Sequence, residues 1–297
     1  MKKKSSAIKG LGIVLTVSLL SVIAILWKNT APPPWERQKA GLFCWESNVI
    51  TDSSAGELLF ETMEDQGLQI LYQSVSLNVG EQGVRDFLSR AAIRDLEVWL
   101  LTGDPRWGLD ADGSGMVEAV RKAAAYNEGQ PEEAAFHGVM MDCEPYLLPE
   151  WDLDAGAVMD RWLSALKAGC RAAEEAGIAF VACIPYYLDT EGFSEQLRAL
   201  TKEGCHGLAV MNYYRENEAA HIQNEVAFAR AAGIPVTVIY ELQPPDGDSI
   251  PEESTYYRLG LPAVERSWEA LMTDFGKTGF SPALHEYEAL LEVTGHE

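Results

Sequence analysis

The sequence is poor in positive charge, and this limits the partners that it can have. Its 297 residues hold 23 lysines and arginines against 45 aspartates and glutamates, a net charge of -22. Residues 1–35 contain five lysines and no acid, so the rest of the chain carries 18 basic and 45 acidic side chains. A surface this acidic repels a phosphate backbone, which argues against nucleic acid as a partner.

Cysteine and histidine are scarce, and neither is spaced for a disulfide framework or a metal. The five cysteines are an odd number and include no C-x-x-C pair. The five histidines form no H-E-x-x-H motif and no cysteine–histidine zinc spacing. We therefore expect buried free thiols and no bound metal. The cysteines are Cys44, Cys143, Cys170, Cys183 and Cys205.

Long apolar runs are absent apart from one near the N-terminus. Residues 11–27 are seventeen uncharged residues, the lower limit for spanning a bilayer, and four lysines precede them. Positive charge on that side keeps the N-terminus in the cytoplasm. We expect a membrane anchor at residues 1–30, a proline-rich linker at 31–39 and an extracytoplasmic catalytic domain at 40–297. A cleaved signal peptide, which would give a secreted domain, is the alternative for residues 1–30.

From residue 41 onward, short apolar runs alternate with segments of helical periodicity such as 157–176 and 217–232. Gly177 and Gly233 follow those two segments, where a helix end favours a left-handed residue. Eight such units in about 250 residues predict an α/β (β/α)8 barrel, or TIM barrel. A doubly wound sheet is the alternative, but the chain has no glycine-rich phosphate turn. The expected strands are residues 41–46, 68–73, 96–102, 137–144, 178–185, 207–213, 234–241 and 280–285.

Acids, amides and aromatic residues gather at the carboxyl ends of these runs, where a barrel carries its active site. Carboxylates transfer protons and aromatic faces stack on sugar rings, so this composition indicates a carbohydrate site. For the aromatic residues, core packing is the alternative, and a lone rim histidine is often structural. The candidate residues are Trp45, Glu46, Gln73, Asp104, Trp107, Asp142, Glu144, Tyr146, Tyr186, Asn212, Tyr213, Glu241 and His285.

Asp142 and Glu144 are the strongest candidates for catalysis. Residues two apart on a strand share a face, so both are expected to point into the barrel mouth. When two carboxylates lie so near each other, the pKa of one of them rises, and that group can then act as a general acid. A buried ion pair is the alternative, although this run contains no lysine or arginine. Glu241 ends the seventh run and is either a second catalytic carboxylate or an exposed loop acid.

Two motifs resemble those of the chitinase-type glycoside hydrolases of family eighteen. They are GVMMDCE at residues 138–144 and VMNY at residues 210–213. The resemblance implies a barrel with Glu144 as the general acid and Asp142 as its partner, orienting an N-acetyl group of the substrate. It also implies that Tyr213 donates a hydrogen bond to the reaction intermediate.

The chain is also similar to the large clan of retaining barrel glycosidases, which carry glutamates at the ends of strands four and seven. Glu144-Pro145 and Glu241 carry this resemblance, and it implies that Glu241 is the nucleophile. Both families imply a glycan substrate, a cell-envelope or extracellular polysaccharide, and a reaction that needs no cofactor. A non-catalytic glycan-binding barrel, or a hydrolase of another envelope bond such as an amide, is the alternative function.

Overall fold

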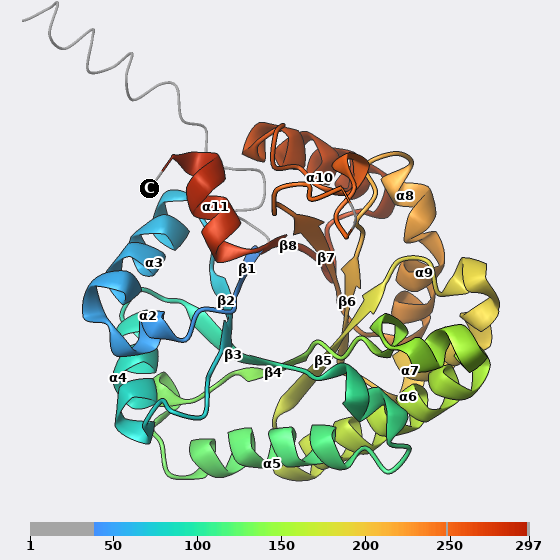
Figure 1. Cartoon of the computed structure of the whole chain (residues 1–297). Coiled ribbons are helices and arrows are strands. Elements are labelled where there is room, and N and C mark those ends of the chain that lie inside the picture. Colours follow the sequence, from blue (N-terminus) through green and yellow to red (C-terminus); the bar gives the residue numbers. More distant parts are fainter. Residues whose placement is uncertain (1–38, 248, 296–297) are drawn as a thin grey trace, which may run out of the picture. The chain divides into compact units, whose positions relative to one another are not determined.

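The computed structural model describes residues 39–247 and 249–295, in which eight parallel strands close into a barrel in chain order (Figure 1). The ring closes between the first strand and the last, where Gly41 pairs with Ala283 and Leu42 with Leu284. This closure confirms the (β/α)8 barrel and excludes the open doubly wound sheet. The strands are β1 (Gly41–Cys44), β2 (Ile70–Ser74), β3 (Glu97–Thr102), β4 (Gly138–Met141), β5 (Ala179–Pro185), β6 (Gly207–Met211), β7 (Val236–Glu241) and β8 (Phe280–His285).

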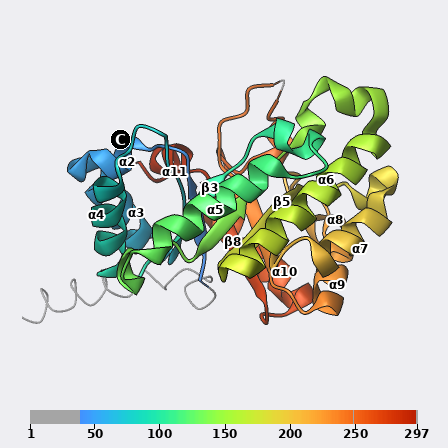
Figure 2. The same cartoon turned by 90° about the horizontal axis from the view of Figure 1, so that it is seen from below.

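The helices form a ring around the barrel. Figure 2 shows the same arrangement after a turn of 90°. The helices that follow each strand cover its outer face, so the strands are buried on both sides and are apolar almost throughout. The longer helices are α3 (Ser53–Asp65), α4 (Glu81–Ala92), α5 (Ser114–Glu128), α6 (Pro149–Ala176), α7 (Ser194–Glu203), α9 (Gln223–Ala232), α10 (Leu261–Phe275) and α11 (Tyr287–Thr294). Shorter elements are α2 (Asn48–Thr51), α8 (Glu218–His221), η1 (Pro105–Leu109), η2 (Glu132–Ala134), η3 (Pro145–Leu147), η4 (Asp189–Phe193) and η5 (Glu252–Ser254).

Each expected strand lies at its predicted run, with differences at the ends. β8 has the predicted bounds, whereas β4 ends at Met141 and not at Glu144. The ladder continues for one more residue, because the N–H of Asp142 donates to the carbonyl of Thr102 (2.9 Å). The helix expected at 217–232 is two helices, which meet at Ile222. Gly177 and Gly233 have the expected positive φ of 66° and 75°.

Two apolar cores lie on the two sides of the strands. The outer core, between strands and helices, includes the fully buried Trp162 of α6 and Trp268 of α10. The inner core fills the barrel with one residue in two along each strand. All five cysteines are buried and free, as the sequence predicted. The inner core comprises Phe43, Tyr72, Leu101, Met140, Cys183, Ala209, Met211, Ile239 and Ala283.

The expected membrane anchor and linker fall on residues that lie outside the described ranges. Within residues 39–247 and 249–295, the structure contains no helix with the length and apolar character needed to cross a membrane. The anchor at residues 1–30 therefore stays a prediction from the sequence.

Candidate active site

The inner core sets which side chains reach the barrel mouth. Met140, Met211, Ile239 and Ala283 all point inward. Side chains alternate along a strand, so the residue two positions further on enters the mouth as well. By this rule the inward residues at the carboxyl rim are Trp45 after β1, Asp142 after β4, Tyr213 after β6, Glu241 of β7 and His285 of β8.

Asp142 is held against the end of β3 by an unusually close approach of two backbones. A Cβ on Gly103 would lie 1.7 Å from the carbonyl oxygen of Asp142, so only glycine fits there. One carboxyl oxygen of Asp142, Oδ1, is buried and has no hydrogen-bond partner among the described residues. Burial, and then the charge of Glu144, raise the pKa of Asp142 from 3.8 to about 7. This carboxyl is therefore protonated far more readily than an exposed aspartate.

Glu144 follows the end of β4, and the turn that begins at Pro145 fixes its side chain. The hydroxyl of Tyr146, in that turn, donates a hydrogen bond to Oε2 of Glu144. Burial is the main cause that raises the pKa of Glu144, and the charge of Glu241 adds to it. The Tyr146 hydrogen bond and His285 act in the opposite direction without cancelling the rise. The sequence argument attributed the raised pKa to Asp142, but burial accounts for most of it.

Glu241 and His285 are register partners on β7 and β8, so their inward side chains lie side by side. Nδ1 of His285 lies 3.1 Å from Oε2 and 3.4 Å from Oε1 of Glu241. The backbone N–H of Gln243 donates to Oε1 of the same carboxylate (2.8 Å). Glu241 is 3 % exposed, so it is a fixed inner carboxylate and not the exposed loop acid of the alternative interpretation.

His285 connects this carboxylate to the edge of the mouth. The indole N–H of Trp45 donates to Nε2 of His285 (3.3 Å), which requires that nitrogen to be unprotonated. Burial alone lowers the pKa of His285, but the hydrogen bond and charge of Glu241, with Asp142 and Glu286, raise it overall. Protonation of His285 therefore strengthens its pairing with Glu241 and removes the acceptor that Trp45 uses.

Tyr213 lies among the acids as a neutral hydroxyl. Its ring centre is 6.1 Å from that of His285. Burial, and then the charge of Glu241, raise its pKa well above the ordinary value, and Asp142 and Glu144 add to the effect. Tyr213 can thus donate a hydrogen bond to an oxygen that becomes negative in the mouth.

Two predicted substrate-binding residues, Gln73 and Asn212, point away from the mouth, and their expected role stays a prediction from the sequence. Gln73 and Asn212 occupy the outward phase of β2 and β6, and both are buried under the helices. The amide of Gln73 donates to the carbonyls of Glu46 (3.2 Å) and Ser74 (2.7 Å), and that of Asn212 to the carbonyl of Glu218 (3.2 Å). These amides therefore fasten strand ends and loops.

The predicted acids after the first and third strands have recorded partners other than Asp142, Glu144 and Glu241. The carboxylate of Glu46 contacts the thiol of Cys44 (3.6 Å). Burial and the nearby charge of Glu286 raise its pKa. Asp104 caps the short helix η1 by accepting from the N–H of Arg106 (2.8 Å).

The predicted aromatic residues divide into two groups. Tyr146 contacts the carboxylate of Glu144, as described above. Trp107 covers Gly115 at the start of α5, and Tyr186 stacks on His221 with ring centres 4.7 Å apart. Neither of these two makes a contact with the acids that the structure records within the described residues.

Two residues in the mouth were missed as candidates. Tyr187 is 6.0 Å from the ring of Tyr146, and the charge of Glu144 contributes to raising its pKa to about 12, after burial. Cys183, from the inner core, lies beside Asp142, and each of the two affects the pKa of the other. The alternation rule identifies Cys183 on β5, whereas Tyr187 lies in the turn after Pro185, beyond the reach of the rule.

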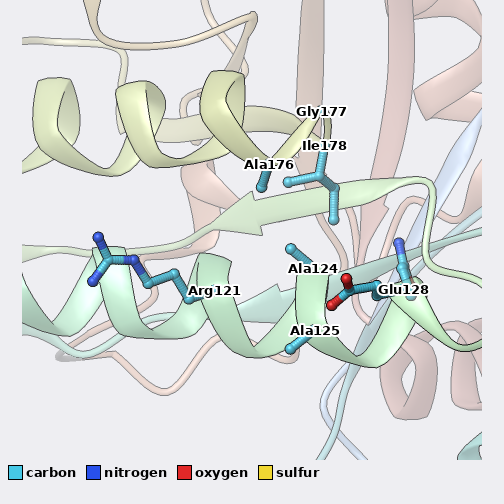
Figure 3. Close-up of a pocket in the computed structure, with 8 residues that line it drawn as sticks. Arg121, Ala124, Ala125, Glu128, Ala176, Gly177 and Ile178 are labelled. Carbon is cyan, nitrogen blue, oxygen red and sulfur yellow. The ribbon is translucent and has the colours of Figure 1, made fainter.

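A hollow and a cluster of possible metal ligands lie away from the mouth. A hollow of about 540 Å³, shown in Figure 3, lies between α5 and the end of α6, where Ala176 and Ile178 precede β5. Cys170, Glu174 and His206 bring ligand atoms within 4.8 Å of one another near the same end of the barrel. However, Nδ1 of His206 accepts a hydrogen bond from the N–H of Phe180 (3.1 Å), so a neutral ring carries its proton on Nε2. Nε2 is the nitrogen that faces Cys170 and Glu174. This arrangement does not suit a metal.

No protein-family model matches the sequence, and no curated protein is recognisably similar to it. Solved structures do share the fold. The catalytic domain of β-amylase from Paenibacillus polymyxa is 7% identical, with a TM-score of 0.54 over 86% of this chain and 92% of that one. A GH5-4 broad-specificity endoglucanase from an uncultured bacterium is 11% identical, with a TM-score of 0.53 over 84% and 87%.

Not all such neighbours are glycosidases. The D-psicose 3-epimerase of Clostridium cellulolyticum H10 is 12% identical, with a TM-score of 0.51 over 83% of this chain and 84% of that one. At these identities the likeness concerns the barrel fold, which hosts many chemistries. The function must therefore be argued from the side chains in the mouth.

Proposed function

We propose that this chain is a glycoside hydrolase that cleaves a cell-envelope or extracellular polysaccharide with a pair of carboxyl groups. The observation that carries the proposal is the contrast between Glu144 and Glu241 in one barrel mouth. Burial raises the pKa of Glu144, which suits a proton donor. Glu241 accepts hydrogen bonds from His285 and from the N–H of Gln243, which suits an ionised carboxylate.

The proposed reaction is a double displacement. Glu144 gives its proton to the glycosidic oxygen as the bond between that oxygen and the anomeric carbon breaks. Glu241 attacks the anomeric carbon and forms a glycosyl ester. Water then replaces the ester, while Glu144 takes up the proton of the water. Tyr213 donates a hydrogen bond to a substrate oxygen, and Trp45, at the edge of the mouth, offers a ring face for a sugar.

Substitution of the two glutamates tests this assignment. General acid catalysis is typically worth about 10²–10⁴-fold, so Glu144→Gln should lower kcat by that factor. The loss should be smallest on aryl glycosides with good leaving groups, because these need little protonation. Glu241→Gly should abolish turnover, and azide should partly restore it by attacking the anomeric carbon. Near-full activity of Glu144→Gln on an unactivated glycan would refute the proposal.

A second mechanism is supported by the proximity of Asp142 to Glu144, whose charge raises its pKa, and to Tyr213, whose pKa it raises. In a chitinase-like reaction Asp142 orients an N-acetyl group of the substrate, and this group attacks in place of Glu241. Asp142→Asn would then be the damaging change, and Glu241→Gln would be tolerated. If several glycans bind but none is cleaved by the parent protein, a non-catalytic glycan-binding barrel is the better account.

We further propose that the apolar run at residues 11–27 anchors the barrel to the outer face of the cytoplasmic membrane. An impermeant protease added to intact cells should then digest the barrel. Protection of the barrel, with a known extracytoplasmic control digested, would refute this orientation.

A further inference from the structure

A second cavity, which we call the β3 groove, runs along the outside of the barrel between α4 and α5. Its volume is about 1020 Å³. Figure 1 shows α4 and α5 as neighbours in the helix ring, with β3 on their inner side. Leu100 and Thr102, the outward residues of β3, line its inner wall. The volume is at the upper end of the range for small-molecule sites.

The β3 groove exists because α5 presents small side chains to this side. Gly115, Ala119 and Ala123 follow one another at intervals of four residues and all line the groove. α5 packs closely on α6 and makes no comparable contact with α4. The gap that a leucine or isoleucine would fill in a closely packed helix ring is therefore left open.

The lining is mostly apolar, and its charged residues are Asp104, which caps η1 at one end, and one pair on α5. The walls are formed by aliphatic and aromatic side chains, and the charged pair Lys122 and Glu118 is mutually neutralised (3.4 Å). An ionic or strongly polar ligand would gain little here, whereas an apolar chain would be removed from water. The apolar lining includes Val75, Val79, Val84, Leu100, Trp107, Tyr126 and Phe136.

The β3 groove is long, and one of its ends lies at the rim of the candidate active site. It reaches from Asp104, beyond the end of β3, to Phe136, just before the start of β4. Along α5 its lining runs from Gly115 to Tyr126, which at about 1.5 Å per residue gives a length of roughly 16 Å. At the upper end, Gly103 lines the groove and also packs against the backbone of Asp142. The groove and the barrel mouth therefore share a wall.

We propose that the β3 groove binds the aliphatic chain of an amphiphilic glycan whose sugar part occupies the barrel mouth. An elongated and mostly apolar groove, with Asp104 at the end near the mouth, fits a single alkyl chain that continues from a sugar. The position of the sugar rests on the proposed function, but the affinity of the groove for the chain does not. The proposed membrane anchor would hold the barrel where such amphiphiles are concentrated.

The experiment measures affinity for hexyl, heptyl and octyl β-glucosides, below their micelle concentrations, by titration calorimetry of the full chain. Each methylene group buried in the groove should tighten binding about fourfold, so octyl glucoside should bind about 15-fold more tightly than hexyl glucoside. Ala119→Trp fills the groove and should remove this dependence. Ala125→Trp is the matched control, because Ala125 lies on the same helix but lines the hollow of Figure 3.

Binding by the N-terminal apolar run is common to both variants, so the difference between them reports on the β3 groove. Ala119→Leu replaces Ala119→Trp if the larger side chain prevents folding. Equal chain-length dependence in the filled and control variants would overturn the proposal. Light scattering measures the mass of the particle in solution. If Ala119→Trp changes this mass but retains the chain-length dependence, the groove is a contact between copies of the chain, and the proposal is overturned. Chain-length dependence without cleavage of any glycoside would leave the groove proposal standing and count against the hydrolase.

Discussion

The substitution Asp142→Asn tests the electrostatics of the barrel mouth, because its effect can be measured as a change in the free energy of unfolding. Burial and the charge of Glu144 raise the pKa of Asp142 from 3.8 to about 7. An acid whose pKa is higher in the folded state than in the unfolded state destabilises the fold once it is ionised. Its stabilising contribution is therefore complete below about pH 4 and is lost as the pH rises through 7.

The size of the effect follows from the shift. About three pKa units at 1.36 kcal/mol each give about 4 kcal/mol as the largest penalty at pH 8. Asparagine carries no charge and has nearly the same size and shape as aspartate. We expect Asp142→Asn to be more stable than the parent by about 2–4 kcal/mol at pH 8, and nearly equal to it at pH 4. For a domain of this size that gain corresponds to about 5–15 °C in Tm.

Urea unfolding of parent and variant at pH 4, 6 and 8 measures this difference directly. Asp274→Asn, which changes an exposed aspartate of α10, is the matched control and should show no such pH dependence. Comparing each variant with the parent at the same pH cancels the titration of all other groups. If Asp142→Asn is no more stable than the parent at pH 8, the carboxyl is not strained by its burial and the reasoning is wrong.

Three further predictions concern residues around the same mouth. The fluorescence of Trp45, measured as the difference between the parent and Trp45→Phe, should change with pH with a midpoint above pH 6.5. The reason is that protonated His285 no longer accepts a hydrogen bond from the Trp45 indole N–H, and a pH-independent difference would contradict this pairing. Gly103→Ala should cost about 3 kcal/mol or more in urea unfolding, since its Cβ would collide with the Asp142 backbone, and a loss under 1 kcal/mol would show that the approach is looser. Tyr213→Phe should lower kcat about 10²-fold, whereas Asn212→Ala should lower stability and leave kcat per folded molecule unchanged; equal kcat losses would place both in one role.

The sequence predicts the barrel well because parallel strands covered on both faces are short continuous apolar runs. The same alternation that puts Asp142 and Tyr213 in the mouth also assigns Gln73 and Asn212 to the outer side. Those two were selected for their position at strand ends alone, and the two-residue period places them on the outer side. Tyr187 lies in the turn beyond the end of β5, where the period no longer applies.

Other features depend on geometry that one sequence does not contain. The pairing of Glu241 with His285 requires the register between β7 and β8, and hydrophobic pattern does not fix the offset of two strands that are apolar on both faces. The hydrogen bond from Tyr146 to Glu144 requires the turn at Pro145, which lies beyond the strand. The β3 groove depends on the spacing of two helices that are separated by a whole strand.

The scarcity of lysine and arginine, the first feature of the sequence, bears directly on the chemistry of the mouth. Within the described ranges, no lysine or arginine forms an ion pair with Asp142, Glu144 or Glu241, and the one recorded ion pair of these acids is with His285. Buried carboxyl groups without cationic partners relieve their repulsion by taking up protons. The arrangement therefore favours a mouth that holds a transferable proton, which the proposed acid–base reaction requires.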